Sequence, residues 1–384
     1  MKILAIETSC DETALAIVEG ADEGPVRHLG SVLRSQAKIH EQYGGVFPAL
    51  AKREHAKNLI PLFDTLIRNT RLHKEKKSEL PTSTKQMLEK ILEREPELLN
   101  ALLSYFTTIE KPDIDYVAVT EGPGLEPALW VGINFAKALH TIWNIPIIGI
   151  NHMEGHIFSV LFDEKNMALK NVEYPVLALL ISGGHTELVL AENQFAYNII
   201  GKTKDDAVGE AFDKVARMMN LPYPGGPHIS ELAEANRRSS NRIRHYTLPR
   251  PMIHSKDFDF SFSGLKTAVL YTIRTIKMLS IEDKQALAEE FENAVTEVLL
   301  EKTRRAIAAH VVRTLIVAGG VIGNIHLRKS FEALVKEFND LTLRIPPPHL
   351  TGDNAVMIAL AGFFRIREGK TTTPNQARGN LRLQ

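Results

Sequence analysis

The chain has 384 residues, with 46 Lys and Arg against 46 Asp and Glu, so its formal net charge is zero. This length exceeds the usual size of one hydrophobic core and predicts two domains or one duplicated architecture. The composition excludes a disordered or fibrous protein, and no run approaches the roughly 18 apolar residues that a membrane span needs. The zero balance argues against a strongly basic nucleic-acid binder.

Two further features of the sequence suggest where the protein works. Met1 leads directly into a strand-like run, so we expect no signal peptide. The single cysteine, Cys10, cannot form an internal disulfide, which suits a reducing compartment. We therefore expect a cytoplasmic protein without membrane association.

One pattern of elements occurs twice along the chain. Residues 2–18 and 176–190 each read as an apolar strand, a polar turn and a second apolar strand. In each half a later strand runs into a glycine turn and an apolar helix, at residues 114–140 and 314–338. Glycine at such a turn lets the backbone approach a ligand and points helix amides at an anion. The duplication predicts a nucleotide or phosphate site, although glycines that only close tight turns are the alternative.

Residues 71–110 interrupt this pattern. A basic run, RLHKEKK, is followed by leucines at helical spacing between Leu88 and Phe106, and Pro96 suits the start of a second helix. The segment therefore reads as a helical insertion between core elements. It is either a decoration that faces solvent or a docking surface for a partner.

Two histidines suggest a metal site. His152 and His156 are four residues apart, so on a helix both imidazoles share one face, as metal ligands or as a buried structural pair. The zincin protease motif places its catalytic glutamate directly after the first histidine. Here Glu154 follows His152 by two residues and projects from a different face, so the protease interpretation lacks its general base.

The third ligand has to come from elsewhere in the chain. Asp353 lies just before an apolar helix that begins near Ala355. It either caps that helix or completes a set of two histidines and one carboxylate. Such a set leaves open positions on the ion, which then acts as a Lewis acid on substrate oxygens.

Ten short runs together resemble the TsaD family of tRNA adenosine threonylcarbamoyltransferases, some of whose members were once called glycoproteases. The resemblance covers nearly the whole chain, and the runs occur in family order. They are Ile6–Thr13, Tyr43–Pro48, Gly122–Leu125, His152–His156, Ser182–Thr186, Gly209–Lys214, Tyr223–Pro227, Phe258–Thr267, Ala318–Val321 with Asn324, and Asp353-Asn354.

The resemblance implies an α/β fold with two RNase H-like lobes of the actin, Hsp70 and sugar-kinase (ASKHA) type and a central cleft, plus the helical insertion. We expect an N-terminal lobe over residues 1–150 and a C-terminal lobe over residues 151–384. The second lobe would include a helical substrate-binding subregion at about 205–300. The C-terminal end is a candidate to pack back on the first lobe.

The resemblance also implies the reaction and its partners. A threonylcarbamoyl group moves from threonylcarbamoyl-AMP to N6 of adenosine 37, in tRNAs that read codons beginning with A, and AMP leaves. Bacterial members work with TsaB and TsaE, the latter an ATPase, so we expect TsaB-like and TsaE-like partner proteins. The expected cofactor is one divalent metal ion per chain, with iron the first choice and zinc the second.

Site residues follow position by position from the resemblance. The metal ligands are His152, His156 and Asp353. The adenylate substrate would contact a second set of residues, which consists of Ile181, Ser182, Gly183, Gly184, His185, Asp213, Gly226 and Asn324. Backbone amides of the Ser182–Gly184 turn can form a nest for a phosphate. A reactive acyl donor needs orientation more than a covalent nucleophile, so Asp11 and Glu12 are candidates to orient the amine or accept its proton.

The sequence departs from the family pattern at several places. Asn151 stands where many relatives have a histidine, and Ser230 where some have an aspartate that touches ribose. Residues 377–384 lack the Pro-Arg-Trp-like ending of many bacterial members, and the insertion is absent from typical members. These departures bear on nucleotide contacts and on partners rather than on the metal ligands.

Local basic patches are candidates for tRNA contact in this neutral chain. The first is formed by Arg237, Arg238, Arg242, Arg244, Arg250 and Lys256. The second is formed by Arg365, Arg367, Lys370, Arg378 and Arg382. Three other functions stay open: a metalloprotease, an ATPase or kinase of the same fold, and a non-catalytic scaffold that binds nucleotide.

Overall fold

A computed structural model describes residues 1–21, 24–163, 168–170, 172–240, 242 and 246–383. The chain forms two compact units, and each is described by itself. Unit 1 consists of Met1–Ile39, Val46–Lys170 and Asp353–Leu383, and unit 2 of His40–Gly45 and Asn171–Gly352. Within the described residues, no helix combines the length and the apolar character that crossing a membrane requires.

Unit 1 is built on a five-stranded mixed sheet with the order β3-β2-β1-β4-β5. Its strands are β1 (Lys2–Glu7), β2 (Glu12–Gly20), β3 (Val26–Ser35), β4 (Tyr116–Gly122) and β5 (Ile147–Asn151). The first three strands are antiparallel, with Ile6 opposite Leu15, whereas β4 and β5 run parallel to β1. Strand β1 is buried almost throughout because helices cover both faces of the sheet, which explains its unbroken apolar run.

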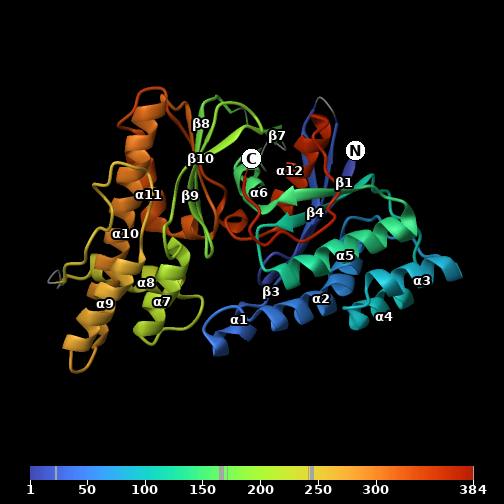
Figure 1. Cartoon of the computed structure of the whole chain (residues 1–384), viewed down its shortest axis with the longest axis horizontal. Helices are drawn as coiled ribbons and strands as arrows, with labels where there is room; N and C mark the ends of the chain where they lie inside the picture. The colour runs from blue at the N-terminus through green and yellow to red at the C-terminus, as the bar shows by residue number, and fades with distance from the viewer. Residues whose placement is uncertain (22–23, 164–167, 171, 241, 243–245, 384) are drawn as a thin grey trace. The chain divides into compact units, whose positions relative to one another are not determined.

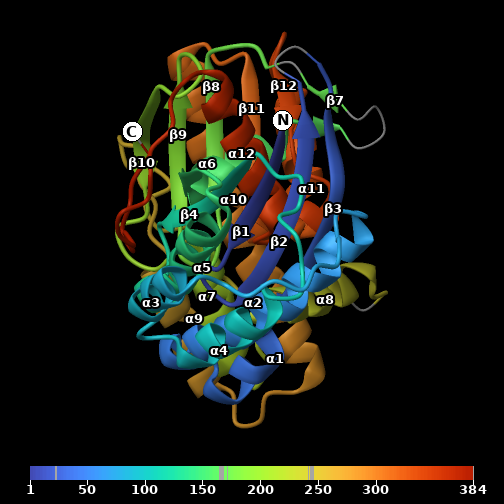
Figure 2. The same cartoon turned by 90° about the vertical axis from the view of Figure 1, so that its right-hand side faces the viewer.

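The helices of unit 1 form two layers around that sheet. They are α1 (Ala37–His40), α2 (Pro48–Asn69), α3 (Thr82–Ile91), α4 (Pro96–Tyr105), α5 (Glu126–Trp143), α6 (His152–Ser159) and α12 (Ala355–Arg367). Helices α2 and α5 pack on one face, and α12 packs on β1 and β2 from the other (Figures 1 and 2). A short hairpin of β6 (Phe162–Asp163) and β7 (Ala168–Leu169) follows α6.

Unit 2 repeats the same topology, with the strand order β10-β9-β8-β11-β12. Its strands are β8 (Val176–Ile181), β9 (Thr186–Ala191), β10 (Tyr197–Lys202), β11 (Thr314–Ala318) and β12 (Thr342–Arg344). Its helices are α7 (Val208–Met218), α8 (Gly225–Arg238), α9 (Ser263–Thr275), α10 (Ile281–His310) and α11 (Ile325–Val335), with short 3-10 turns at Gly320–Gly323 and Pro348–Leu350. The duplicated α/β architecture expected from the sequence is thus confirmed.

The compact units differ from a division at residue 150. Residues 151–170 and 353–383 belong to unit 1, although both ranges follow the expected boundary. The reason is packing: α12 is apolar on all sides and is buried between the first sheet and α6, so its return to unit 1 removes Ala355–Phe364 from water. The C-terminal end therefore completes the first core.

The 71–110 segment forms two helices, α3 and α4, and Pro96 begins the second as expected. Its apolar side is not a solvent-facing decoration. Leu88, Leu92, Leu98 and Leu102 are fully buried, in the same core as Phe63 of α2. Helix α4 packs on α2 and α3 on α5, so the segment closes the core of unit 1 (Figure 1).

This packing predicts the effect of truncating a leucine in the segment. Leu98→Ala should lower the free energy of unfolding by about 2–5 kcal/mol, because it removes buried methyl groups and leaves a cavity. The matched control is Met87→Ala on α3, whose side chain is 55% exposed, and which should change stability by less than about 0.5 kcal/mol. Urea denaturation measures both. Equal effects of the two substitutions would show that α4 does not belong to the core.

Candidate functional site

The two histidines of the predicted metal site lie on α6, the short helix that follows β5. Asn151 caps this helix: its side-chain oxygen accepts hydrogen bonds from the amides of Met153 (2.9 Å) and Glu154 (3.4 Å). The residue that departs from the family pattern therefore fixes the start of the helix. His152 and His156 follow one turn apart, with ring centroids 4.8 Å from each other, and both are buried.

Asp353 joins the two histidines from the other end of the chain. The cap of α12 is Asn354, whose side-chain oxygen accepts from the Met357 amide at 3.1 Å. Asp353 does not fill the capping role that was its alternative, and its Oδ1 lies 3.3 Å from Nε2 of both His152 and His156. Three potential ligand atoms, one from each residue, lie within 4.8 Å of one another.

The distances from Asp353 to the two imidazoles fit a shared ion. Two atoms that each lie about 2.1 Å from one metal are about 3–3.5 Å apart at ordinary coordination angles. The carboxylate–imidazole distances of 3.3 Å match that spacing. Both ring nitrogens of His156 are buried, and neither forms a well-aligned hydrogen bond within the described residues. A buried imidazole is normally hydrogen-bonded, so a ligand for His156 is the simplest account of this exception.

A further set of residues, which the sequence reasoning missed, contacts Nδ1 of His152, the ring nitrogen that does not face Asp353. Nδ1 of His152 lies 3.1 Å from Oε2 of Glu7 and 3.2 Å from Oγ of Ser9. Glu7 is fully buried and also accepts from the Thr120 hydroxyl (2.6 Å) and the Ser9 amide (2.5 Å). Carboxylates that orient a ligating imidazole in this way are common around metal sites. The sequence signal that could have found Glu7 is an acidic residue at the end of an apolar strand.

The charges of the cluster act on one another. Burial opposes ionisation of Asp353, but the two histidines hold the pKa of its carboxyl well below the usual range. Burial also opposes protonation of His152, yet the carboxylates of Asp353 and Glu7 raise its pKa well above the usual value. The pKa of His156 is lowered, mainly by burial. Burial thus favours the neutral form of His156, which a ligand needs, whereas His152 lies between two acids.

The two catalytic candidates lie near this cluster. Burial, Asp11 and Asp353 together raise the pKa of Glu12 well above its ordinary value, so its carboxyl can hold a proton nearer to neutral pH. Asp11 is buried at the turn between β1 and β2. Cys10 lies in the same turn, and burial with the neighbouring acids raises the pKa of its thiol, which makes it a poor nucleophile.

Glu154 is engaged elsewhere. Its fully buried carboxylate forms a bidentate ion pair with Arg365 of α12, at 2.5 Å to Nε and 3.1 Å to Nη2. The side chain therefore ties α6 to α12. This contact accounts for the glutamate within the histidine motif without a protease function.

The expected substrate-binding residues all lie in unit 2, and most surround the start of α7. The turn Ser182–His185 is closed by a hydrogen bond from the Ser182 amide to the His185 carbonyl (2.9 Å). Gly183 and Gly184 are exposed, and a Cβ on either would meet nothing within 4 Å. Ile181 is fully buried, and its carbonyl lies against Gly319, where φ is +100°. Ile181 therefore supports the turn from inside and offers no exposed surface to a ligand.

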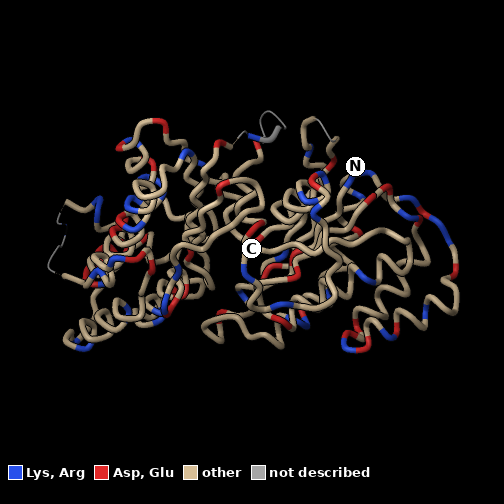
Figure 3. The backbone as a smooth tube through the Cα atoms, turned by 45° about the horizontal axis from the view of Figure 1, so that its top comes forward, with Lys and Arg blue, Asp and Glu red and all other residues tan. Residues whose placement is uncertain are grey.

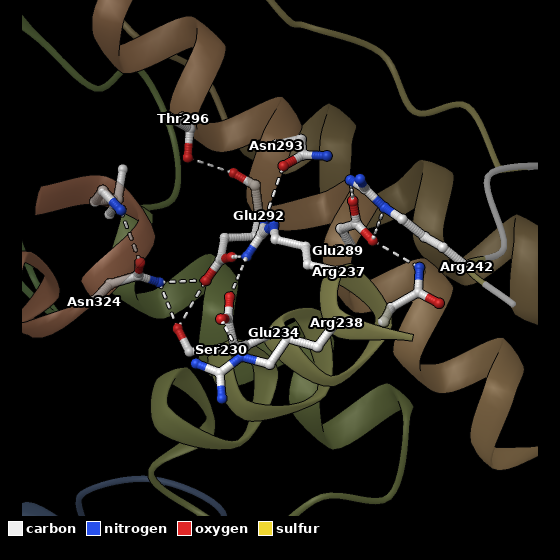
Figure 4. Close-up of polar contacts among 12 residues, drawn as sticks. Ser230, Glu234, Arg237, Arg238, Arg242, Glu289, Glu292, Asn293, Thr296 and Asn324 are labelled. Atoms are coloured by element: carbon white, nitrogen blue, oxygen red, sulfur yellow. Dashed lines mark hydrogen bonds and ion pairs between the residues drawn. The ribbon is translucent and has the colours of Figure 1, made fainter. Parts of the chain in front are cut away.

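The remaining three residues have structural roles. Asp213 accepts the Gly225 amide at 2.7 Å and so fixes the first turn of α8, where Gly226 has open space at its Cβ position. Asn324 caps α11 and donates to Oγ of Ser230 and Oε1 of Glu292, each at 2.5 Å (Figure 4). The amide of Asn324 is therefore part of an internal network.

The first basic patch is largely neutralised by α10. Arg237 pairs with Glu292 at 2.5 Å, and Arg242 pairs with Glu289 (Figure 4). Arg250 pairs with Glu290 (2.5 Å) and Glu297 (2.8 Å). Of the other three cations, Arg238 pairs with Glu234, Lys256 is exposed, and Arg244 lies outside the described residues. The paired arginines hold α8 and the following loop to α10 and are not available for RNA.

The ion pair of Glu154 yields a prediction. Glu154→Gln should lower the free energy of unfolding by about 1–3 kcal/mol, because a charged hydrogen bond to Arg365 is lost in a buried place. Glu93→Gln, at an exposed position of the insertion, is the matched control and should change stability by less than about 0.5 kcal/mol. Urea denaturation measures both. No difference between the variants would show that the pair does not secure α6.

Comparison with known proteins places the chain in a family. The sequence model of TsaD, described as tRNA N6-adenosine threonylcarbamoyltransferase, matches residues 27–79 and 89–360. The match is interrupted at residues 80–88, inside the 71–110 segment. Two enzymes of that name, from Bacillus thuringiensis (strain Al Hakam) and Thermosipho melanesiensis, are 38% and 39% identical.

The relatives match over nearly their whole length. The first covers 97% of this chain and 93% of its own, and the second covers the whole of both chains. Among solved structures, full-length HypF in its phosphate- and nucleotide-bound form has a TM-score of 0.50 and 12% identity, over 97% of this chain and 47% of that one. That likeness concerns the fold alone, which is of the ASKHA type. The chain belongs to the family of tRNA N6-adenosine threonylcarbamoyltransferases and is an acyltransferase.

Proposed function

We propose that this enzyme transfers the threonylcarbamoyl group of threonylcarbamoyl-AMP to N6 of adenosine 37 in tRNAs that read codons beginning with A, with one divalent metal ion and with AMP as leaving group. The observation that carries the metal-assisted part is the convergence of His152, His156 and Asp353, together with the buried His156 ring that lacks a well-aligned hydrogen bond among the described residues. The enzyme would work in the cytoplasm, where its tRNA substrate is.

The donor set suits the proposed ion. His152, His156 and Asp353 would hold it, and two imidazoles with one carboxylate are a set that iron accepts and that zinc also tolerates. When bound, the ion supplies a Lewis acid that polarises an oxygen of the acyl group. Glu7 and Ser9 would keep the His152 ring in place through its Nδ1. Because ligands must be unprotonated, His152 would give up its proton when the site fills.

The residues of unit 2 suit the nucleotide part of the donor. The amides of Gly183 and Gly184 donate to no other described residue. Both amides can therefore donate hydrogen bonds to the phosphate oxygens of a ligand at this turn. Asp213 holds the first turn of α8, where Gly226 lets a ligand approach the backbone closely. Asn324 would act through the network that it shares with Ser230 and Glu292.

The transfer itself exchanges one bond to the acyl carbon for another. The N6 nitrogen of adenosine attacks the carbamoyl carbon, the bond from that carbon to the AMP oxygen breaks, and N6 loses one proton. Glu12 is a candidate acceptor because burial and its acidic neighbours raise the pKa of its carboxyl. Asp11, in the same turn, is the candidate to orient the amine.

A metalloprotease is the second function suggested by the histidine motif. It requires Glu154 to activate a water, but that carboxylate is bound by Arg365. A protease would lose all activity in Glu154→Gln, whereas the proposed transferase would lose only stability.

Reconstitution tests the proposal. The purified chain, loaded with Fe(II), is mixed with threonylcarbamoyl-AMP and unmodified tRNA, with and without TsaB-like and TsaE-like proteins, and the nucleosides are analysed. We expect N6-threonylcarbamoyladenosine from the wild type. His156→Ala should lower the rate at least about 100-fold, since loss of a ligand exceeds the usual effect of its supporting residues. The control His254→Ala changes an exposed histidine and should leave the rate unchanged.

Two results would contradict the proposal. If no modified adenosine forms with any combination of partners, the enzyme does not catalyse the proposed reaction. If the wild type and His156→Ala react at equal rates, the proposed reaction stands, but it does not depend on an ion held by His156.

A further inference from the structure

The C-terminal segment of the described chain lies on unit 1, bends in a turn at residues 379–380, and is held by its main chain. The Arg378 amide donates to the Glu121 carbonyl (2.8 Å), and the Gly124 amide donates to the Gly379 carbonyl (3.1 Å). Nδ2 of Asn151 donates to the Arg382 carbonyl at 3.2 Å. We call residues 377–383 the C-terminal strap.

The C-terminal strap packs closely against the residues of unit 1 that it covers. Gly122 has a φ of +152°, and a Cβ at this position would lie 1.9 Å from the Arg378 carbonyl oxygen. Leu383, near the end of the strap, is only 6% exposed. A loosely attached tail would need neither a glycine under it nor a buried terminal leucine. The strap is therefore a fixed part of unit 1.

Asn151 connects the strap to the helix of the candidate metal ligands. Its side-chain oxygen caps α6, while its amide nitrogen holds the Arg382 carbonyl. Because His152 is the next residue, the strap passes beside the start of the helix that carries both histidines. Two departures from the family pattern, at residue 151 and at the C-terminus, thus contact each other.

The anchoring leaves the arginine side chains of the strap available. Arg378 and Arg382 are exposed, and among the described residues neither forms an ion pair. Two other members of the second basic patch are engaged: Arg365 by Glu154, and Arg367 by the ring of Phe364 at 5.1 Å. Basic and acidic residues are spread along the trace of each unit (Figure 3), and other exposed cations also lie outside ion pairs. Arg378 and Arg382 differ from those by their place, on a segment that Asn151 holds beside the start of α6.

We propose that the C-terminal strap is a tRNA-contacting surface, on which Arg378 and Arg382 bind backbone phosphates beside α6. The inference rests on the proposed function, because that function supplies tRNA as the substrate. A planar guanidinium binds phosphate oxygens in a bidentate manner, and exposed arginines on a rigid backbone lose little freedom when they do so. The main-chain anchors keep both side chains next to the reaction site of unit 1.

The double substitution Arg378→Ala with Arg382→Ala tests this surface. Binding of unmodified tRNA is measured by fluorescence anisotropy between about 20 and about 200 mM salt, a range over which phosphate contacts weaken steeply. Loss of two phosphate contacts should reduce the slope of log K against log salt by about 1.4–1.8. Thermal stability should not change, because both side chains are exposed.

The matched control is Arg274→Ala with Lys277→Ala, which removes the same charge from exposed positions of unit 2. It should leave the slope unchanged. A second measurement serves even for weak binding. A photoreactive benzoylphenylalanine at Asn380, between the two arginines, should cross-link to labelled tRNA, whereas the same group at Lys277 should not.

The outcomes separate the two proposals. If the wild-type chain binds and cross-links no tRNA even at low salt, either alone or with TsaB-like and TsaE-like proteins added, the proposed function fails. If it binds tRNA but the double variant keeps the wild-type slope and Asn380 gives no cross-link, only the strap proposal is overturned. A cross-link from Asn380 to an added partner protein in place of tRNA would also overturn it.

Discussion

A buried carboxylate, that of Glu7, organises the candidate site. Glu7 ends the first strand of unit 1 and is removed from water, which is costly unless its oxygens are paired. The structure pairs them with the Ser9 amide, the Thr120 hydroxyl and the His152 ring. The turn after β1, the strand β4 and the helix α6 thereby meet at this carboxylate, which lies 3.1 Å from Nδ1 of His152.

The second constraint is the return of the chain to unit 1. Helix α12 is apolar on all sides and has to be covered, and its burial against the first sheet carries Asp353 to histidines that lie far earlier in the sequence. Asparagines make this geometry possible. Asn151 caps α6 and Asn354 caps α12, so neither His152 nor Asp353 has to serve as a helix cap. The side chains next to the caps are left to converge on one position.

Much of this could be read from the sequence, because the relevant signals are local. Apolar strands joined by polar turns predicted both sheets, the four-residue spacing predicted the paired histidines, and Pro96 predicted the start of α4. The rest depends on contacts between distant segments. A single acid in Glu7 gives no sign of its partner Thr120. The basic run around Arg237 looked free because its acids lie much later in the chain, on α10. The 71–110 segment could be interpreted as a solvent-facing decoration because leucines at helical spacing do not indicate which elements cover them.

The family membership and the site geometry support one another at different levels. The comparisons give the class of enzyme, and the three converging side chains are a set that could hold the proposed ion. The supporting role of Glu7 belongs to this chain's own structure and links the fold to the chemistry. It follows from hydrogen bonds and burial alone, so it can be tested without the reaction.

The most direct test of the account is an Fe(II) or Zn(II) titration of the wild type and of Glu7→Gln, with circular dichroism to check that both are folded. Glutamine keeps the shape of the side chain but not its charge. If Glu7 fixes and polarises His152, the variant should bind the ion about 10–100-fold more weakly. Equal affinities of the two folded proteins would contradict the claim that this carboxylate builds the site.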